Sequence, residues 1–170
     1  MDYSELKEKA PLLKPGDRVY FTGTIYTARD QAHIRLMNLL ERGEALPFAL
    51  EGAIIYYAGP TPGRGERPTL ACGPTTSSRM DEFSPALYDR GVFATIGKGP
   101  RSGVVNEAIA RNGALYLCAT GGAGALIAKC IEKMDVIAFP ELGCEAIRRV
   151  EVNNLPLIVG TDTNGSTLFK

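Results

Sequence analysis

A nine-residue stretch near the middle of the chain, GPTTSSRMD at residues 73–81, concentrates polar side chains between apolar segments. It offers hydroxyl groups, an arginine and an aspartate behind a Gly-Pro pair. A guanidinium group binds a carboxylate through two parallel hydrogen bonds, and a hydroxyl acts as a base only when its surroundings activate it. The stretch therefore indicates a loop that holds a small anion, the alternative being a tight, solvated turn.

Three further polar or glycine-rich stretches follow apolar segments: TARDQAH at 27–33, IGKGPRSG at 96–103 and ATGGAGAL at 119–126. Each of the three precedes an expected helix, and the free N–H groups of a helix N-terminus favour bound anions. Together the stretches would bring two arginines and a lysine to one edge of a sheet, a set that suits a small dianion. The cations concerned are Arg29, Arg79 and Lys98, with Arg101 as a further candidate.

The glycine-rich stretches match no nucleotide-binding signature. Pro100 follows Gly99 and no hydroxyl follows Lys98, so the phosphate-loop pattern GxxxxGK[ST] is absent. Ile127 stands where the dinucleotide fingerprint requires a glycine. A nucleophile elbow, GxSxG, is also missing. Taken singly, each of these stretches is typical of an ordinary turn between a strand and a helix.

Length and charge narrow the class of protein. The chain has 170 residues, and its 19 Lys and Arg residues balance 19 Asp and Glu residues. No net field therefore favours nucleic acid or an acidic membrane surface. The N-terminus, MDYSELKEKAPLLKPGD, is charged where a signal peptide would be apolar. We expect a cytoplasmic protein with one domain over residues 1–170, in which 1–15 form a peripheral N-terminal segment, and neither a nucleic acid nor a membrane as partner.

The cysteines are too widely spaced for the common metal motifs, and they are Cys72, Cys118, Cys130 and Cys144. Two of them, Cys118 and Cys130, stand in apolar stretches and are expected to be buried as small hydrophobic residues. The pattern favours reduced thiols in a reducing compartment and predicts no metal site in this chain.

Strand and helix patterns alternate along the sequence. Strands are expected over residues 18–26, 53–59, 69–73, 92–97, 114–120, 136–140, 149–153 and 156–160. Helices are expected from a cap at Thr27 to about Arg42, from Ser84, and over 103–112 and 123–134, with a helical turn around 141–147. This alternation predicts a one-domain α/β protein whose mixed central sheet is flanked by helices. Its polar loops would gather where the strands end.

The motifs as a set resemble those of the β-subunit, or C-terminal domain, of iron–sulfur class I fumarate hydratases and L-tartrate dehydratases. The resemblance rests on TGTIYTARDQAH, YYAGP, GPTTSSRMD, IGKG and ELGCEAI in this order, and it extends from about Gly16 through the final strands. It implies a single swivelling β/α domain in a hydro-lyase that hydrates fumarate reversibly to L-malate. The alternative within the resemblance is an L-tartrate dehydratase β-subunit, which converts tartrate to oxaloacetate.

The resemblance also implies a partner. In that family a [4Fe–4S] cluster is held by cysteines of the other half, the α-subunit, and its open iron acts as a Lewis acid on the departing hydroxyl. This chain would bind no cluster by itself and would be active only with its α-subunit. The expected assembly is an α₂β₂ heterotetramer that acts on a small dicarboxylate.

Carried over residue by residue, the resemblance assigns Arg29, Arg79 and Lys98 as clamps for the carboxylates and the hydroxyl of the substrate. Thr75 resembles the residue that removes the C3 proton. A free hydroxyl is a poor base, so Arg79 and Lys98 would have to lower its pKa, which gives them a catalytic role as well. A supporting set would orient the arginines, and its members are Asp30, His33 and Asp81.

Two hypotheses from other classes remain open. The chain could be a non-catalytic dicarboxylate-binding module that has kept the fold and lost its partner. It could also be a distinct enzyme that acts alone through Thr75, His33 or Cys72. His33 is the only histidine of the chain, and on its own it fits a packing residue as well as a site residue.

Overall fold

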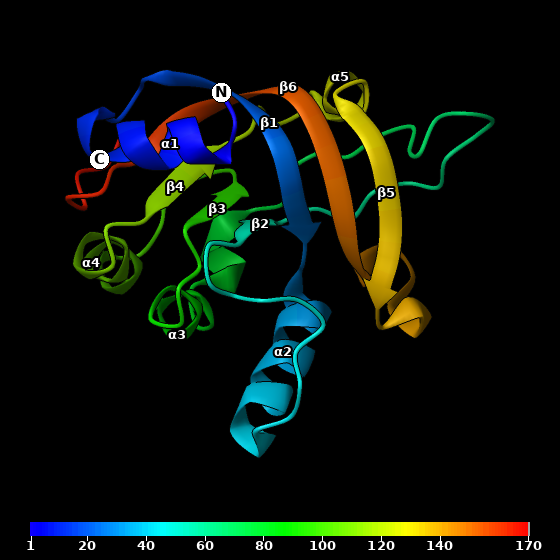
Figure 1. Ribbon diagram of the computed structural model, residues 1–170, viewed down its shortest axis with the longest axis horizontal. Helices are drawn as coiled ribbons and strands as arrows, with labels where there is room; N and C mark the ends of the chain where they lie inside the picture. Colours follow the sequence, from blue (N-terminus) through cyan, green and yellow to red (C-terminus); the bar gives the residue numbers. More distant parts are fainter. Residues whose placement is uncertain (170) are drawn as a thin grey trace.

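Six strands form one mixed sheet in the computed structural model, which describes residues 1–169 (Figure 1). They are β1 (Arg18–Thr27), β2 (Ile54–Tyr56), β3 (Ala94–Gly97), β4 (Leu115–Cys118), β5 (Ile131–Ala138) and β6 (Ile147–Thr161). Strands β1 to β4 are parallel neighbours in chain order. The long strand β6 runs antiparallel to both β4 and β1 and so closes the sheet on itself. Strand β5 pairs with the first half of β6, along the edge opposite β1. The mixed α/β architecture predicted from the sequence is confirmed.

The helices are short and lie outside the closed sheet. They are α1 (Tyr3–Lys9), α2 (Asp30–Arg42), α3 (Ser84–Tyr88), α4 (Gly103–Arg111) and α5 (Gly124–Ala128), with 3₁₀ turns η1 (Ala10–Leu12), η2 (Ser77–Met80) and η3 (Pro140–Glu145). Helices α2, α3 and α4 gather on one side of the sheet (Figure 1). Among residues 1–169, no helix is both long enough and apolar enough to cross a membrane.

Two apolar clusters account for most of the buried surface. One fills the inside of the closed sheet and includes Val19, Phe21, Ile25, Ile54, Leu117, Val150 and Leu157. The other lies between the sheet and helices α2 to α4 and includes Leu36, Ile55, Leu87, Val105 and Ile109. Strands β2 and β3 are therefore buried on both faces, which explains why their sequences are apolar without alternation. The N-terminal segment 1–15 adds no strand to the sheet, yet its Leu6 and Ala10 are buried in the first cluster.

One expected helix ends early, and its last four residues belong to a strand. The apolar pattern over 123–134 predicted a helix, but α5 ends at Ala128 and β5 begins at Ile131. The strand pairs with β6 over its whole length and leaves most of its outer side chains exposed. Pairing with the free edge of β6 outweighs the helix propensity of this segment, because propensity is a weak preference that tertiary contacts override.

Three other boundaries differ from the sequence predictions. Residues 69–73 form no strand, because β2 already has β1 and β3 on its two sides. The two strands expected at 149–153 and 156–160 are one continuous strand, β6. Helix α2 begins at Asp30 with Arg29 as its N-cap, since Thr27 is the last residue of β1 and its hydroxyl accepts a hydrogen bond from the Arg148 N–H.

The topology gathers the polar loops at one edge. Because β1, β2, β3 and β4 are parallel neighbours, their C-terminal ends lie side by side at the same edge of the sheet. The TARD, GKG and TGGAG stretches directly follow β1, β3 and β4, and the GPTT loop is held against the end of β2 by the hydrogen bond from the Thr75 N–H to the Tyr57 carbonyl. Strand β5 points the same way, since both β1 and β5 are antiparallel to β6, and it delivers η3 to this edge. The convergence is what open parallel sheets use to form binding sites.

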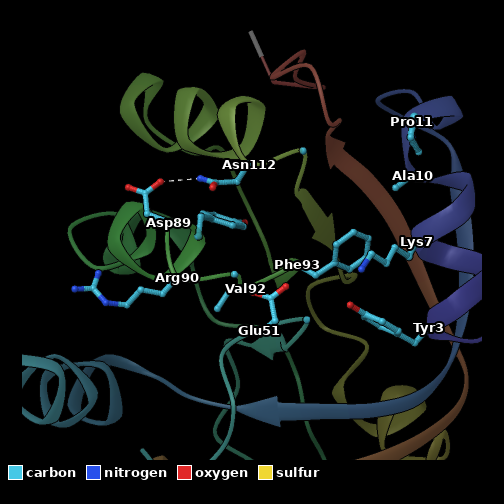
Figure 2. A pocket seen from close by; sticks show the side chains of 14 residues that line it. Tyr3, Lys7, Ala10, Pro11, Glu51, Asp89, Arg90, Val92, Phe93 and Asn112 are labelled. Carbon is cyan, nitrogen blue, oxygen red and sulfur yellow. Dashed lines mark hydrogen bonds between the residues drawn. The ribbon is translucent and has the colours of Figure 1, made fainter. Parts of the chain in front are cut away.

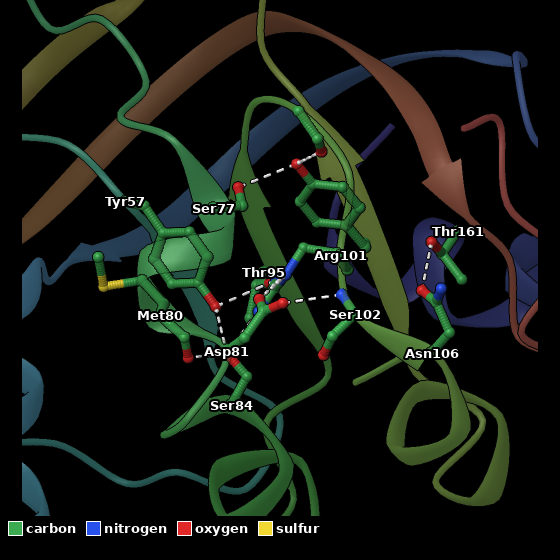
Figure 3. A network of polar contacts seen from close by, with 12 residues as sticks. Tyr57, Ser77, Met80, Asp81, Ser84, Thr95, Arg101, Ser102, Asn106 and Thr161 are labelled. Atoms are coloured by element: carbon green, nitrogen blue, oxygen red, sulfur yellow. Dashed lines mark hydrogen bonds and ion pairs between the residues drawn. The ribbon is translucent and has the colours of Figure 1, made fainter. Parts of the chain in front are cut away.

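A buried arginine ties these loops together beneath the site edge. The Arg101 side chain is fully buried, and its Nε donates to Asp81 Oδ1 at 2.7 Å (Figure 3). Its other nitrogens donate to the hydroxyls of Ser84, Thr95 and Tyr57. The second oxygen of Asp81 accepts from the Ser102 N–H, the N-cap of α4, at 2.7 Å. One ion pair thus joins the end of GPTTSSRMD, α3, β3 and the start of α4.

The buried pair gives a stability prediction. Asp81→Asn removes the charge that balances Arg101, and losing one partner of a buried pair costs on the order of 3–5 kcal/mol. We expect a loss of that size in the free energy of unfolding, measured by urea denaturation. Asp89→Asn is the matched control. Asp89 forms an ion pair with Arg111 through two hydrogen bonds that are as short as the one between Asp81 and Arg101, but this pair is about half exposed and screened by water. Equal losses in the two variants would contradict the structural role of Asp81.

His33 is a second buried polar group, and it lies on the inner face of α2. Its Nδ1 is 2.8 Å from the carbonyl oxygen of Arg29, so this nitrogen carries the proton and donates it. The ring packs between Tyr57 and Phe83, and its Nε2 has no hydrogen-bond partner among residues 1–169. Burial lowers the pKa of His33 from 6.5 to about 4. The imidazole is therefore neutral at physiological pH.

The low pKa of His33 makes stability depend on pH. The unfolded chain takes up this proton below the ordinary pKa of 6.5, whereas the folded chain takes it up only near pH 4. Stability should therefore fall as the pH is lowered, by about 2 kcal/mol between about pH 7 and about pH 5. His33→Asn keeps a donor for the Arg29 carbonyl, cannot titrate, and should abolish this slope in urea denaturation. A wild-type slope that survives the substitution would contradict the assignment, because the chain has no other histidine.

Candidate active site

Two arginines and an aspartate meet at the end of β1. Arg79, from η2, donates two hydrogen bonds to the carboxylate of Asp30, at 3.0 and 2.8 Å. Asp30 opens α2, and its Oδ2 also lies 3.9 Å from the Nε of Arg29. The carboxylate therefore lies between the two guanidinium groups predicted as clamps and fixes the orientation of Arg79.

The guanidinium of Arg29 is held differently from that of Arg79. Its Nε has no hydrogen-bond partner among residues 1–169, and its nearest carboxylate oxygens lie at 3.7 and 3.9 Å. The 3.7 Å contact is to Glu145, at the end of η3. Arg29 is three-quarters buried and close to two carboxylates, yet it is hydrogen-bonded to neither of them.

Thr75 and Lys98 belong to two neighbouring loops that are bonded to each other. The Thr75 N–H donates to the Tyr57 carbonyl at 2.7 Å, which holds the loop against the end of β2. Thr76 pairs with Lys98 as a parallel bridge, and the Ser77 N–H donates to the Lys98 carbonyl at 2.9 Å. Thr75 is half-buried and Lys98 exposed, so the hydroxyl and the amine are presented at the same edge of the sheet.

Glycines make room for this arrangement. A side chain at Gly97 would collide with the Ser77 side chain and the Tyr57 ring, so the first glycine of GKG permits the close approach of the GPTT loop. The Lys98 side chain runs over Gly121, where a Cβ would lie 3.9 Å from Nζ. The glycine-rich TGGAG stretch thus lies beside the Lys98 side chain. This position is also compatible with the alternative prediction that the stretch is an ordinary turn between a strand and a helix.

Three of the expected site residues lie below the site. Arg101, a further candidate for the cation set, is buried in the network described above and does not face the edge. Asp81 pairs with Arg101 and not with Arg29 or Arg79, so it supports the loop rather than orienting a clamp. The buried His33 bonds the backbone carbonyl of Arg29 and not its guanidinium, and its ring packs against Tyr57 and Phe83.

The thiol and the imidazole considered for a stand-alone enzyme are poorly suited to that role. Cys72 is fully buried, and burial raises the pKa of its thiol to about 12. Because a thiolate is the nucleophilic form, this cysteine is unreactive at neutral pH. His33 is equally inaccessible. Of the three residues named for that hypothesis, Thr75 alone reaches the site edge.

Sequence reasoning missed two residues of the site, Glu145 and Gly59. Glu145 lies in ELGCEAI, a stretch whose place beside Arg29 depends on the path of β5. A Cβ at Gly59 would lie 2.9 Å from Nη1 of Arg29, so the guanidinium rests on bare backbone there. Local sequence patterns place Glu145 in a turn and Gly59 at the end of a strand. Neither pattern indicates a contact with Arg29.

A large cavity among the described residues lies elsewhere. It measures about 680 Å³ and opens at the N-terminal ends of β2 to β4. Figure 2 shows Tyr3 and Lys7 of α1 facing Glu51 and Phe93 across it. None of the residues predicted for the site lines this cavity. Its position at the opposite end of the strands separates it from the cluster of cations.

The residues of this chain do not fit an iron–sulfur cluster. Within residues 1–169, no three His, Cys, Asp or Glu side chains are grouped so that they could hold a metal ion. The four cysteines are free, and they lie on different elements of the fold. The site edge itself presents cations and hydroxyls, which suit an anion and not a cation.

Comparisons with known proteins agree with the motifs. The chain is 38% identical over 170 residues to a protein of Methanocaldococcus jannaschii provisionally named L(+)-tartrate dehydratase subunit beta, with 96% of this chain and 87% of that protein covered. It is 36% identical over 156 residues to fumarate hydratase 2 of Leishmania major, and 37% identical over 155 residues to the anaerobic class I fumarate hydratase of Escherichia coli.

Coverage differs between these relatives. The matches take in 91% and 90% of this chain, but the chain spans only 28% of the length of each of the two fumarate hydratases. The family model described as "Fumarase C-terminus" matches residues 1–170. A family match over the whole chain, together with identities above one third, leads to one conclusion: this chain belongs to the fumarase C-terminus family.

Proposed function

We propose that this chain is the β-subunit of a two-subunit hydro-lyase that interconverts fumarate and L-malate. The observation that carries the proposal is the convergence of Arg29, Arg79 and Lys98 with the Thr75 hydroxyl at one edge of the sheet. The membership of the family and the names of the relatives support a hydro-lyase rather than a binding module.

The cations of this chain would bind the substrate. The terminal Nη1 and Nη2 groups of Arg29, which make no hydrogen bond to Asp30 or Glu145, would grip one carboxylate of a small dicarboxylate, since a guanidinium binds a carboxylate through two parallel bonds. Arg79 uses one edge of its guanidinium on Asp30 and keeps its remaining N–H groups for the second carboxylate or the hydroxyl. Lys98 adds a mobile point charge beside the Thr75 loop. These groups would hold the substrate dianion in one orientation.

Thr75 would move the proton at C3. The Thr75 hydroxyl must first release its own proton to solvent, which requires neighbouring positive charge to lower the pKa of this hydroxyl. In the dehydration direction the deprotonated Oγ1 then takes the proton from C3, the C2–C3 double bond forms, and the C2–O bond breaks as the substrate hydroxyl leaves. Lys98 can supply the positive charge, because its backbone pairs with Thr76 and accepts a hydrogen bond from the Ser77 N–H, which keeps it beside the Thr75 loop. Arg79, four residues further along the same stretch, supplies a second cation.

The missing half of the site would come from a second chain. In the two fumarate hydratases the matched part is 28% of a longer polypeptide, which supports a separate partner that corresponds to the remainder. We propose that this α-subunit carries a [4Fe–4S] cluster, that the assembly is α₂β₂, and that it is cytoplasmic. When bound there, the cluster would supply Lewis-acid chemistry at the departing hydroxyl.

Tartrate is the second candidate substrate, and one observation favours it. The M. jannaschii relative, which this chain covers over 87% of its length, carries the name of a tartrate dehydratase subunit. Malate and tartrate differ by a single hydroxyl at C3. A site that hydrogen-bonds this hydroxyl would reject malate strongly, so relative kcat/KM values for the two substrates separate the two functions.

Reconstitution tests the two-subunit proposal. We expect this chain expressed alone to turn over neither malate nor tartrate, and the chain co-expressed with its cluster-bearing partner to turn over one of them. Formation of fumarate or oxaloacetate, followed under anaerobic conditions, is the measurement. Turnover by the single chain after exhaustive chelation would contradict the requirement for a partner. An assembled, cluster-bearing complex that binds a dicarboxylate without turnover would favour the non-catalytic module.

Substitutions at Thr75 test the proton transfer. Thr75→Val removes the hydroxyl and nearly preserves the shape, so kcat of the two-chain enzyme should fall by about 10²–10⁴ while substrate binding survives. Thr75→Ser keeps the hydroxyl and should retain more activity. Thr76→Val is the matched control, because this exposed hydroxyl is adjacent and has no assigned role. Solvent exchange of the malate C3 hydrogen at the wild-type rate in Thr75→Val would exclude Thr75 as the base.

A further inference from the structure

Arg29 lies between two carboxylates without a hydrogen bond to either. Its Nη2 is 3.7 Å from Glu145 Oε1, and its Nε is 3.9 Å from Asp30 Oδ2. Both distances exceed those of an N–H···O hydrogen bond. The guanidinium is therefore oriented by charge from two sides, without a hydrogen bond to either carboxylate that would occupy its terminal nitrogens.

The two carboxylates are anchored by different partners. Asp30 is committed to Arg79 by two hydrogen bonds, so Arg79 fixes the direction of its carboxylate. Glu145 is fixed by α2, because its Oε2 accepts from the Gln31 N–H at 3.0 Å. That N–H is one of the free donors in the first turn of the helix, a position that stabilises a negative charge. The second oxygen of Glu145 is thus held toward Arg29.

The segment that carries Glu145 is itself held in place. Arg148 donates to the carbonyl oxygens of Gly143, Cys144 and Ala146, which fixes the end of η3. The Cys144 carbonyl also lies near Gly59, where the absent side chain makes room for Arg29. Glu145 therefore approaches Arg29 from a rigid backbone, and the opposite side of the guanidinium rests on Gly59.

From this geometry we propose that Glu145 is a positioning residue for Arg29, which makes η3 part of the dicarboxylate site. The inference rests on the proposed function for the identity of the ligand. Glu145 keeps a long, rotamer-rich side chain in the orientation that binds a carboxylate, so less conformational freedom is lost when substrate binds. Its own contact is with Arg29 and the first turn of α2, and it needs no contact with substrate.

Two physical effects of removing this carboxylate act in opposite directions. The local positive charge rises, which attracts a dianion more strongly, while the guanidinium loses one of the two charges that orient it. A positioning role requires the second effect to dominate. The sign of the change in KM therefore distinguishes a positioning residue from a negative charge that merely opposes the substrate.

Glu145→Gln in the two-chain enzyme is the test, because the amide oxygen can still accept from the Gln31 N–H while the charge is lost. We expect KM to rise by about 5–20-fold and kcat to change by less than about 3-fold, the pattern for lost ground-state binding. Glu141→Gln is the matched control: Glu141 lies in the same segment, is exposed, and is 4.0 Å from Arg35. A KM that is unchanged or lower in Glu145→Gln overturns the proposal.

A second measurement does not depend on turnover. In ¹⁵N spectra of the full chain, the Nε–H signal of Arg29 is identified by its loss in Arg29→Lys. Glu145→Gln should shift and sharpen this signal as the side chain becomes mobile, and Glu141→Gln should leave it in place. An unmoved Arg29 signal in Glu145→Gln overturns the positioning role. If the two-chain enzyme acts on no dicarboxylate, the proposed function fails, and the Arg29 signal still decides the role of Glu145.

Discussion

The buried pair of Arg101 and Asp81 is the interaction on which the site edge depends. A guanidinium with no exposed surface needs a balancing charge and a partner for each nitrogen, and Arg101 finds them on segments that are distant in the sequence. The second carboxylate oxygen of Asp81 accepts a hydrogen bond from the N–H of Ser102, the N-cap residue of α4. The last residue of the polar stretch GPTTSSRMD is therefore anchored, and Thr75 and Arg79 lie in a loop whose C-terminal end is held in place.

Closure of the sheet supplies the second constraint. Because β6 pairs with both β4 and β1, the four parallel strands are held in a curved row and their C-terminal ends face the same side. Polar loops directly follow β1, β3 and β4 there, and η3 follows β5 beside them. Thr75 and Arg79 lie in the long segment between β2 and α3, and hydrogen bonds to the carbonyl oxygens of Tyr57 and Lys98 hold this segment against the strand ends. Anchoring of this kind holds functional groups at fixed separations.

Carboxylates hold the two arginines at the site edge in different ways. Asp30 bonds Arg79 directly, whereas Arg29 is flanked by Asp30 and Glu145 at distances that leave its donors free. A cavity of about 680 Å³ lies at the opposite end of the strands and contains none of these groups. A second cavity, of about 450 Å³, lies beside η3 and is lined by Gly143, Cys144 and Arg148.

The sequence by itself determined the α/β class, the strands β1 to β4 and the loops that carry Arg29, Thr75, Arg79 and Lys98, because apolar runs and glycine-rich breaks are local signals. Only the tertiary structure decided that residues 131–134 belong to a strand and not to a helix, that Arg101 is buried with Asp81, and that Glu145 stands beside Arg29. Each of these depends on a contact between residues far apart in the chain. The free edge of β6 outweighs a local helix preference, and a buried cation selects the carboxylate that the folded backbone brings to it.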